Sequence, residues 1–134
     1  MASDSWFIII FSLVIFNYLF SIVLNFINSR NWKPDIPSNM KDFYDENKYQ
    51  KARDYGKEKE RISFIGSTIS LLLMLLMLSF NGFGILNDFS TDFSESVYVQ
   101  TGIFFLILFV ASDLISLPFS WYNTFVIEEK YGFN

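Results

Sequence analysis

The sequence contains no cysteine and no histidine. Without cysteine there is no disulfide framework and no thiol chemistry. Without histidine, the commonest metal ligand and the commonest general base are both missing. There is also no H-E-x-x-H, no glycine-rich phosphate loop and no nucleophile with a base nearby. From the residues alone we predict no catalytic residue, no metal ligand and no cofactor in this chain.

Positive charge is scarce outside one segment. Nine of the ten Lys and Arg lie between Arg30 and Arg61, and the tenth is Lys130. The net charge of −4 argues against nucleic acid as a partner. Hydrophobic residues make up 51% of the 134 residues, more than a single soluble core of this size could hide. Apolar blocks separated by charged loops indicate an integral membrane protein, whose first partner is the lipid bilayer.

Three apolar runs are long enough to cross a membrane, at about 6–27, 62–80 and 97–117. The first reaches roughly 33 Å, and a hydrocarbon core is about 30 Å thick. A signal peptide is the weaker interpretation of this run, because Asp4 precedes it without any basic residue and no small-x-small cleavage site follows. The predicted fold class is an all-α membrane protein with three transmembrane helices, in a single membrane domain over 1–134.

The loops between these spans differ in character. Loop 28–61 is polar and predicts a helix from about Asn39, which can cap it, with Gly56 as its weakest point. No proline interrupts it, so we expect one long helix that continues into the second span. Segment 81–96 is predicted as a loop, because its opening Asn81-Gly-Phe-Gly favours the left-handed conformations that end helices.

Orientation follows from the positive charges. Basic residues concentrate on the cytoplasmic side of membrane proteins, so loop 28–61 is predicted to be cytoplasmic. The N-terminus and loop 81–96 are then external, and the C-terminal tail is cytoplasmic. An odd number of spans makes these assignments consistent.

Two residues in or near the third span are unusual. Asp113 is the only formal charge within the spans, and a carboxylate at mid-bilayer costs about 2.5–3.5 kcal/mol on insertion scales. It either faces a water-filled chamber or reaches the cytoplasmic interface. Pro118 removes the amide partner of the Leu114 carbonyl, which predicts either a kink or the end of the helix.

The chain closes on "SLPFSWYNTFVIEEKYGFN", residues 116–134. Adjacent glutamates on a helix do not share a face, so by chemistry alone Glu128 and Glu129 are a solvated helix end. The stretch nevertheless resembles the end of the N-terminal membrane region of Ste-type CAAX prenyl proteases, which are zinc metallopeptidases. The matching residues are Pro118, Phe119, Tyr122, Thr124, Phe125, Glu128, Glu129, Lys130, Tyr131, Gly132, Phe133 and Asn134.

A second resemblance to the same family lies in the polar loop, where a proline precedes a pattern of tyrosines and lysines. The matching residues are Pro37, Tyr49, Lys51, Ala52, Tyr55 and Lys59. The family resemblance implies a polytopic protein around a large water-filled chamber. It also implies a zinc ion in the full-length enzyme, held by the histidines of H-E-x-x-H and a downstream glutamate.

This sequence departs from the family where the catalytic half would begin. We therefore expect an N-terminal membrane domain that forms part of the chamber wall, with the matched residues in structural roles. Its expected partners are the missing catalytic half and a peptide or prenylated-peptide substrate. The alternative is a free-standing three-helix membrane scaffold or partner subunit, which a stop codon directly after codon 134 would favour. Richness in Phe, Ile, Asn and Lys favours a bacterial inner membrane over the endoplasmic reticulum.

Overall fold

The computed structural model describes residues 2–30 and 45–133, and every regular element in them is helical. The elements are α1 (Ala2–Arg30), α2 (Glu46–Ser79), α3 (Gly82–Asp92), α4 (Val97–Tyr122), the π-helical η1 (Asn123–Glu128) and α5 (Glu129–Tyr131). Three stretches within them are long and apolar enough to cross a membrane: Ser5–Arg30, Glu46–Ser79 and Val97–Tyr131. The predicted all-α class and the three candidate spans are confirmed.

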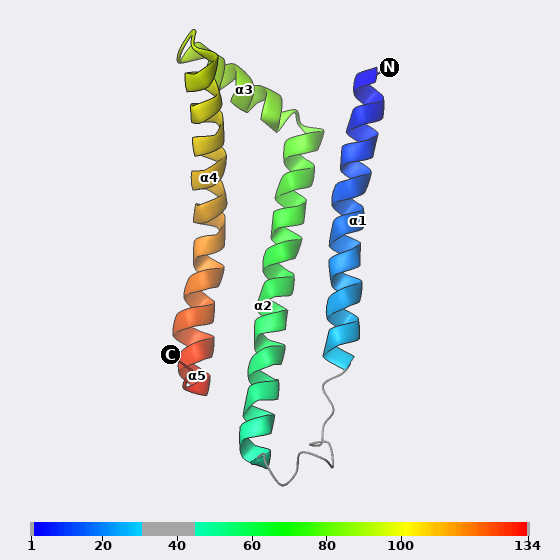
Figure 1. Ribbon diagram of the computed structural model, residues 1–134, viewed down its shortest axis with the longest axis vertical. Helices are drawn as coiled ribbons and strands as arrows, with labels where there is room; N and C mark the ends of the chain where they lie inside the picture. Colours follow the sequence, from blue (N-terminus) through cyan, green and yellow to red (C-terminus); the bar gives the residue numbers. More distant parts are fainter. Residues whose placement is uncertain (1, 31–44, 134) are drawn as a thin grey trace.

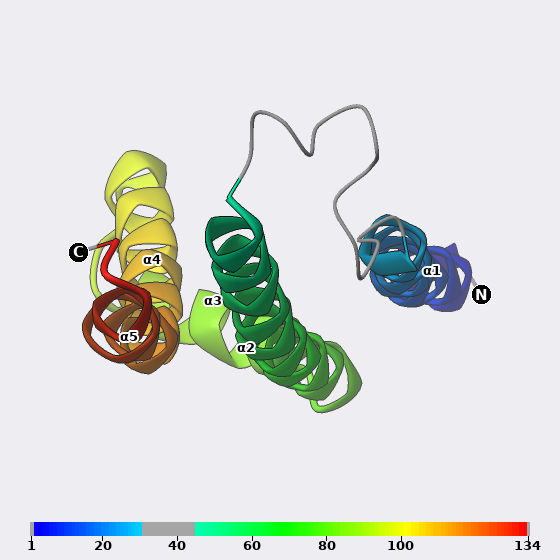
Figure 2. The ribbon, with the colours of Figure 1, turned by 90° about the horizontal axis from the view of Figure 1, so that it is seen from below.

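The three long helices run side by side, with α2 between α1 and α4 (Figure 1). The short helix α3 crosses obliquely from the end of α2 to the start of α4, at the end of the molecule where the N-terminus lies. Seen from below, α1, α2 and α4 keep this order (Figure 2). The last turns of the chain therefore descend beside the first half of α2.

Helix α2 begins at Glu46, because Asp45 caps it. The Asp45 backbone is extended (φ −69°, ψ 125°), and its carboxylate accepts a hydrogen bond of 2.9 Å from the Asn47 amide. The predicted cap, Asn39, lies outside the described residues. From Glu46 the helix is unbroken through Gly56 to Ser79.

The predicted break after the second span is confirmed, but the segment that follows is more ordered than a loop. Asn81 adopts the left-handed conformation (φ 56°), and α3 starts at the next residue. A methyl group on Gly82 would collide with Met77, and one on Gly84 would collide with the Asn81 side chain. These glycines therefore permit a tight turn between two helices. In α3, Ser90 is buried and donates to the Leu86 carbonyl at 2.8 Å.

Helix α4 continues past Pro118 to Tyr122, so of the two predicted alternatives, a kink or a helix end, the structure excludes the helix end. Proline removes one amide donor, and the helix survives the loss of that single bond to Leu114. The backbone then passes into the π-helical η1, a geometry that occurs mostly as single turns within longer helices.

The described residues form almost no core of their own. Only Ile127 and Ser90 among them are buried, whereas large apolar side chains are exposed along α1, α2 and α4. Between α1 and α2, the Tyr18 hydroxyl lies 2.6 Å from Thr68 Oγ1. Helices that are apolar on most of their circumference are typical of membrane spans, whose remaining surface is covered by lipid or by other helices.

Candidate functional site

The two segments that carry the family resemblance meet where α5 lies beside α2 (Figure 1). The ring of Tyr55 packs edge-on against Tyr131, with centroids 5.7 Å apart, and lies tilted against Phe133, with centroids 4.7 Å apart. Aromatic pairs at such separations contribute about 0.5–1.5 kcal/mol beyond their buried area. We call the contacts between residues 51–59 and 128–133 the motif junction.

A polar cluster lies beside these rings. Lys59 Nζ donates to the Tyr55 hydroxyl at 2.9 Å and lies 3.5 Å from Glu128 Oε1. The Tyr55 hydroxyl also approaches this carboxylate oxygen, at 3.5 Å. The Lys59 and Glu128 side chains are 39% and 25% exposed. Because water still reaches both groups, the ion pair fixes geometry more than it adds stability.

A second ion pair crosses the motif junction, between Lys130 and Glu58. Of the three consecutive charged residues, Glu128 and Lys130 therefore both bind α2, while Glu129 is exposed. The prediction of a solvated helix end consequently holds only for Glu129.

The glycine and phenylalanine of the motif form the C-cap of α5. Gly132 has a positive φ of 67°, which glycine adopts without steric strain. Its amide donates to the Glu129 carbonyl at 3.0 Å, and the Phe133 amide donates to the Glu128 carbonyl at 2.9 Å. These two bonds define a Schellman motif. The cap turns Phe133 back onto Tyr55, and Lys51 Nζ lies 5.9 Å from the centre of its ring.

A groove of about 1050 Å³ lies between α2 and α4, on the side of the motif junction toward α3. Its lining includes three serines from each helix: Ser63, Ser67, Ser70, Ser112, Ser116 and Ser120. Ser67 donates to the Phe64 carbonyl at 3.0 Å, and Ser116 lies 3.0 Å from the carbonyls of Ser112 and Asp113. Each hydroxyl oxygen still has acceptor capacity toward the groove.

These serines were not predicted, although the sequence carries a signal for them. Serines recur four residues apart at Ser63 and Ser67, and again at Ser112, Ser116 and Ser120. Residues at this spacing share one helix face. These serines form a polar stripe on otherwise apolar spans, and this stripe is the sequence signal that could have indicated the groove.

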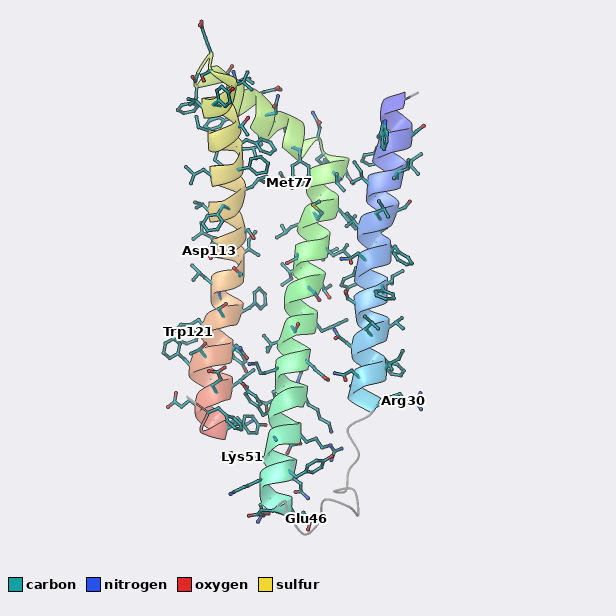
Figure 3. All side chains as sticks on the ribbon, viewed as in Figure 1. Arg30, Glu46, Lys51, Met77, Asp113 and Trp121 are labelled. Atoms are coloured by element: carbon teal, nitrogen blue, oxygen red, sulfur yellow. The ribbon has the colours of Figure 1, made fainter. Side chains whose placement is uncertain are left out.

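Other motif residues line the groove or lie outside it. The Phe119 ring lines it and is 3.7 Å from the position that a methyl group on Gly66 would take. Pro118 and Tyr122 border a shallow apolar hollow on the outer side of α4, together with Trp121, whose side chain points away from α2 (Figure 3). Phe125 is exposed and stacks beside Trp121, with ring centroids 5.8 Å apart.

The remaining motif residues take no part in the polar cluster. Tyr49, Ala52 and Thr124 are half-buried. Pro37 and Asn134 lie outside the described residues.

Asp113 lies about midway along α4 and is exposed (Figure 3). It does not line the groove, although its neighbour Ser112 does. Among the described residues its carboxylate has no hydrogen-bond or ion-pair partner. The motif junction and Asp113 are therefore separate features of this chain.

The described residues do not suit a zinc ion. A catalytic zinc site takes three protein ligands from His, Cys, Asp or Glu. The chain has no His and no Cys, and residues 2–30 and 45–133 contain no group of three acidic residues that could hold a metal. In the motif junction, Glu58 and Glu128 are each engaged by a lysine.

Comparisons with known proteins agree with the family resemblance. Residues 25–134 match the family described as "CAAX prenyl protease N-terminal, five membrane helices". The probable CAAX prenyl protease 1 of Schizosaccharomyces pombe is 38% identical over 111 residues, covering 73% of this chain and 23% of the relative. The CAAX prenyl protease 1 homolog of Dictyostelium discoideum is 28% identical over 137 residues, covering 97% and 32%.

A solved structure is also similar. The crystal structure of S. mikatae Ste24p superposes with a TM-score of 0.83 at 26% sequence identity, over 95% of this chain and 31% of that one. The chain thus spans about a quarter to a third of the length of the proteins it matches. These relatives come from eukaryotes, so the comparisons give no support to the predicted bacterial inner membrane.

Proposed function

The chain belongs to the CAAX prenyl protease family, as the N-terminal membrane region of its members, and we propose that its serine-lined groove forms part of the wall of an intramembrane chamber. The match covers only 23% and 32% of the two relatives described above, so most of each relative lies outside the matched region. In this proposal the chain is a multi-pass membrane region that shapes and hydrates the space where another part of the protein cleaves peptides.

The six serines in this otherwise mainly apolar groove carry the proposal. Its serines lie on α2 and α4 within the predicted spans 62–80 and 97–117, apart from Ser120 just beyond. Asn25 of α1 and Asn123 of η1 line the same groove. Polar side chains at membrane depth face protein or a water-filled cavity rather than lipid. The outer side of α4 carries Leu114, Leu117 and Trp121 instead, as lipid contact favours.

The motif junction has a supporting role in the same proposal. If loop 28–61 is cytoplasmic, the junction lies where the third span leaves the membrane on that side. Its two ion pairs and the Schellman cap fix α5 against α2, and thereby the direction in which the backbone leaves Phe133. A downstream half of the protein would then start from a defined position relative to the groove.

Peptide hydrolysis itself is assigned to residues outside this chain. Zinc, where the full-length protein holds it, would supply a Lewis acid and an activated water to the scissile peptide. The residues of this chain contribute shape, hydroxyl groups and exclusion of lipid. Peptides or prenylated peptides are the proposed substrates of the whole protein.

Cysteine accessibility tests the chamber wall, and these 134 residues contribute no native cysteine to the background reaction. Ser67→Cys and Ser116→Cys in the groove should react with a small charged thiol reagent in intact membranes. Leu72→Cys and Leu114→Cys, on exposed apolar faces, are the matched controls and should react far more slowly. Equal protection of all four positions would contradict a hydrated groove.

A further inference from the structure

One face of α4 has no partner among the described residues and carries the unpaired acid. At about 100° per residue, Gly102, Leu106, Phe109 and Asp113 fall within roughly 60° of one another around the helix axis. All four are exposed, and a methyl group on Gly102 would meet nothing within 4 Å. We call this face the α4 flank. Five of the seven groove-lining residues of α4 lie roughly 90–170° around the axis from the centre of this face. The other two, Ser116 and Ser120, follow Asp113 by about one and two turns and form the border between the groove and the α4 flank.

We propose that the α4 flank is the docking surface for a further membrane helix of the longer protein, and that this helix presents a basic or hydrogen-bond-donating side chain to Asp113. The proposal rests on the assignment of this chain to an N-terminal membrane region. It goes beyond that assignment by naming a surface and the chemistry of its partner.

Lipid is a poor occupant for this face. A carboxylate within a span is expensive to expose to hydrocarbon, and such residues pair with other protein groups or face a cavity. Leu114 and Trp121, on the adjacent outer face, show that α4 has an apolar surface suited to lipid. The α4 flank differs from it by one glycine and one acid. Small residues allow two helices to approach closely, and polar side chains bond across such contacts.

The family description counts more membrane helices than the described part of this chain contains. That description gives five membrane helices, whereas the described residues contain three candidate spans. Helix α2 covers one side of α4, and α1 packs on α2 rather than on α4 (Figure 2). An additional helix could therefore pack on the open surface of α4. The α4 flank is the part of that surface that carries Asp113.

Photo-crosslinking in the protein as its gene encodes it, in native membranes, tests this docking. A benzophenone amino acid at Leu106 or Phe109 should give a protein adduct, which peptide mapping assigns to an apolar segment outside residues 1–134. The same probe at Leu114 is the matched control and should give lipid adducts. If positions 106 and 109 give only lipid adducts, or adducts to a second copy of residues 1–134, the proposal is overturned.

A substitution series tests the partner of Asp113. If a donor faces the carboxylate, Asp113→Leu lowers Tm and Asp113→Asn, which keeps an acceptor oxygen, lowers it less. If Asp113 faces lipid, Asp113→Leu raises Tm instead, which overturns the proposal. Rapid reaction of Asp113→Cys with a charged thiol reagent would also overturn it, because the acid would then face a water-filled chamber. Reactivity of Ser67→Cys and Ser116→Cys reports on the groove separately, so either proposal can fail without the other.

Discussion

Lys59 and Glu128 lie 3.5 Å apart, between Nζ and Oε1, although 69 residues separate them in the sequence. Each belongs to a different one of the two motifs that connect this chain to its family. Their contact, together with the Glu58–Lys130 pair, shows that the two motifs form one three-dimensional feature.

Neutralising either member of this pair should have a small effect on stability. Lys59→Gln and Glu128→Gln are each expected to lower the free energy of unfolding by about 1 kcal/mol or less, because half-exposed ion pairs are screened by water. A double-mutant cycle by thermal unfolding in detergent measures the coupling. A coupling well above that range would mean that the pair is more shielded than its exposure indicates.

Tyr55 should matter more through its ring than through its hydroxyl. Tyr55→Ala removes two aromatic contacts, each worth about 0.5–1.5 kcal/mol beyond burial, whereas Tyr55→Phe removes only hydrogen bonds worth about 0.5–1.5 kcal/mol. We expect the alanine variant to have the lower Tm. A lower Tm for the phenylalanine variant would mean that the polar cluster stabilises the motif junction more than the aromatic contacts do.

Gly132→Ala should destabilise the end of the chain. A side chain at φ 67° is strained, so a loss of about 1 kcal/mol is expected. Gly66→Ala is the matched control, because its methyl group would rest at ordinary contact distance from Phe119 within a regular helix. Thermal unfolding of the two variants should separate them, and equal Tm values would argue against the Schellman cap as a stabilising element.

Topology can be checked by labelling single cysteines in intact cells. If loop 28–61 is cytoplasmic and segment 81–96 external, Thr91→Cys reacts with an impermeant reagent and Gln50→Cys reacts only after permeabilisation. Both residues are exposed, whereas the neighbouring Ser90 is buried and is a poor probe. Labelling of position 50 from outside intact cells would mean that loop 28–61 is external and that the predicted topology is inverted.

The purified 134-residue chain should bind no stoichiometric zinc and cleave no prenylated peptide. It has neither His nor Cys, and its junction carboxylates face lysines. Metal analysis after purification without chelator, with a peptide cleavage assay, checks this expectation. One tightly held equivalent of zinc, or turnover that a chelator abolishes, would place the chemistry in this chain after all.

Much of the helical framework was predictable, because long apolar runs and the helix break at Asn81 are local signals. Helix α3 was missed because its eleven residues include two glycines and form no long apolar run. The sequence also left undecided whether α4 continues past Pro118, since a single proline can either kink or end a helix.

The contacts of the motif junction could not be predicted from the hydrophobic pattern of the sequence. A lysine at 59 and a glutamate at 128 each look like ordinary interfacial charges until the two helices are placed together. Family resemblance singled out these residues, but it gave no reason for them. The reason is geometric, and it depends on how η1 and the Gly132 cap aim the last turns at α2.

The π-helical η1 also sets a requirement on length. Every fourth residue from 115 to 131 faces the interior of the molecule or α2. Ile115, Phe119 and Asn123 line the groove, Ile127 is buried, and Tyr131 contacts Tyr55. In an uninterrupted α-helix the sixteen steps from Ile115 to Tyr131 would drift by about 160° around the axis, and Tyr131 would end on the far side. The wider turn of η1 offsets part of that drift. Deleting one residue from 123–127 would thus rotate the side chains of residues 128–133 away from α2 while leaving the Glu-Glu-Lys motif intact in the sequence.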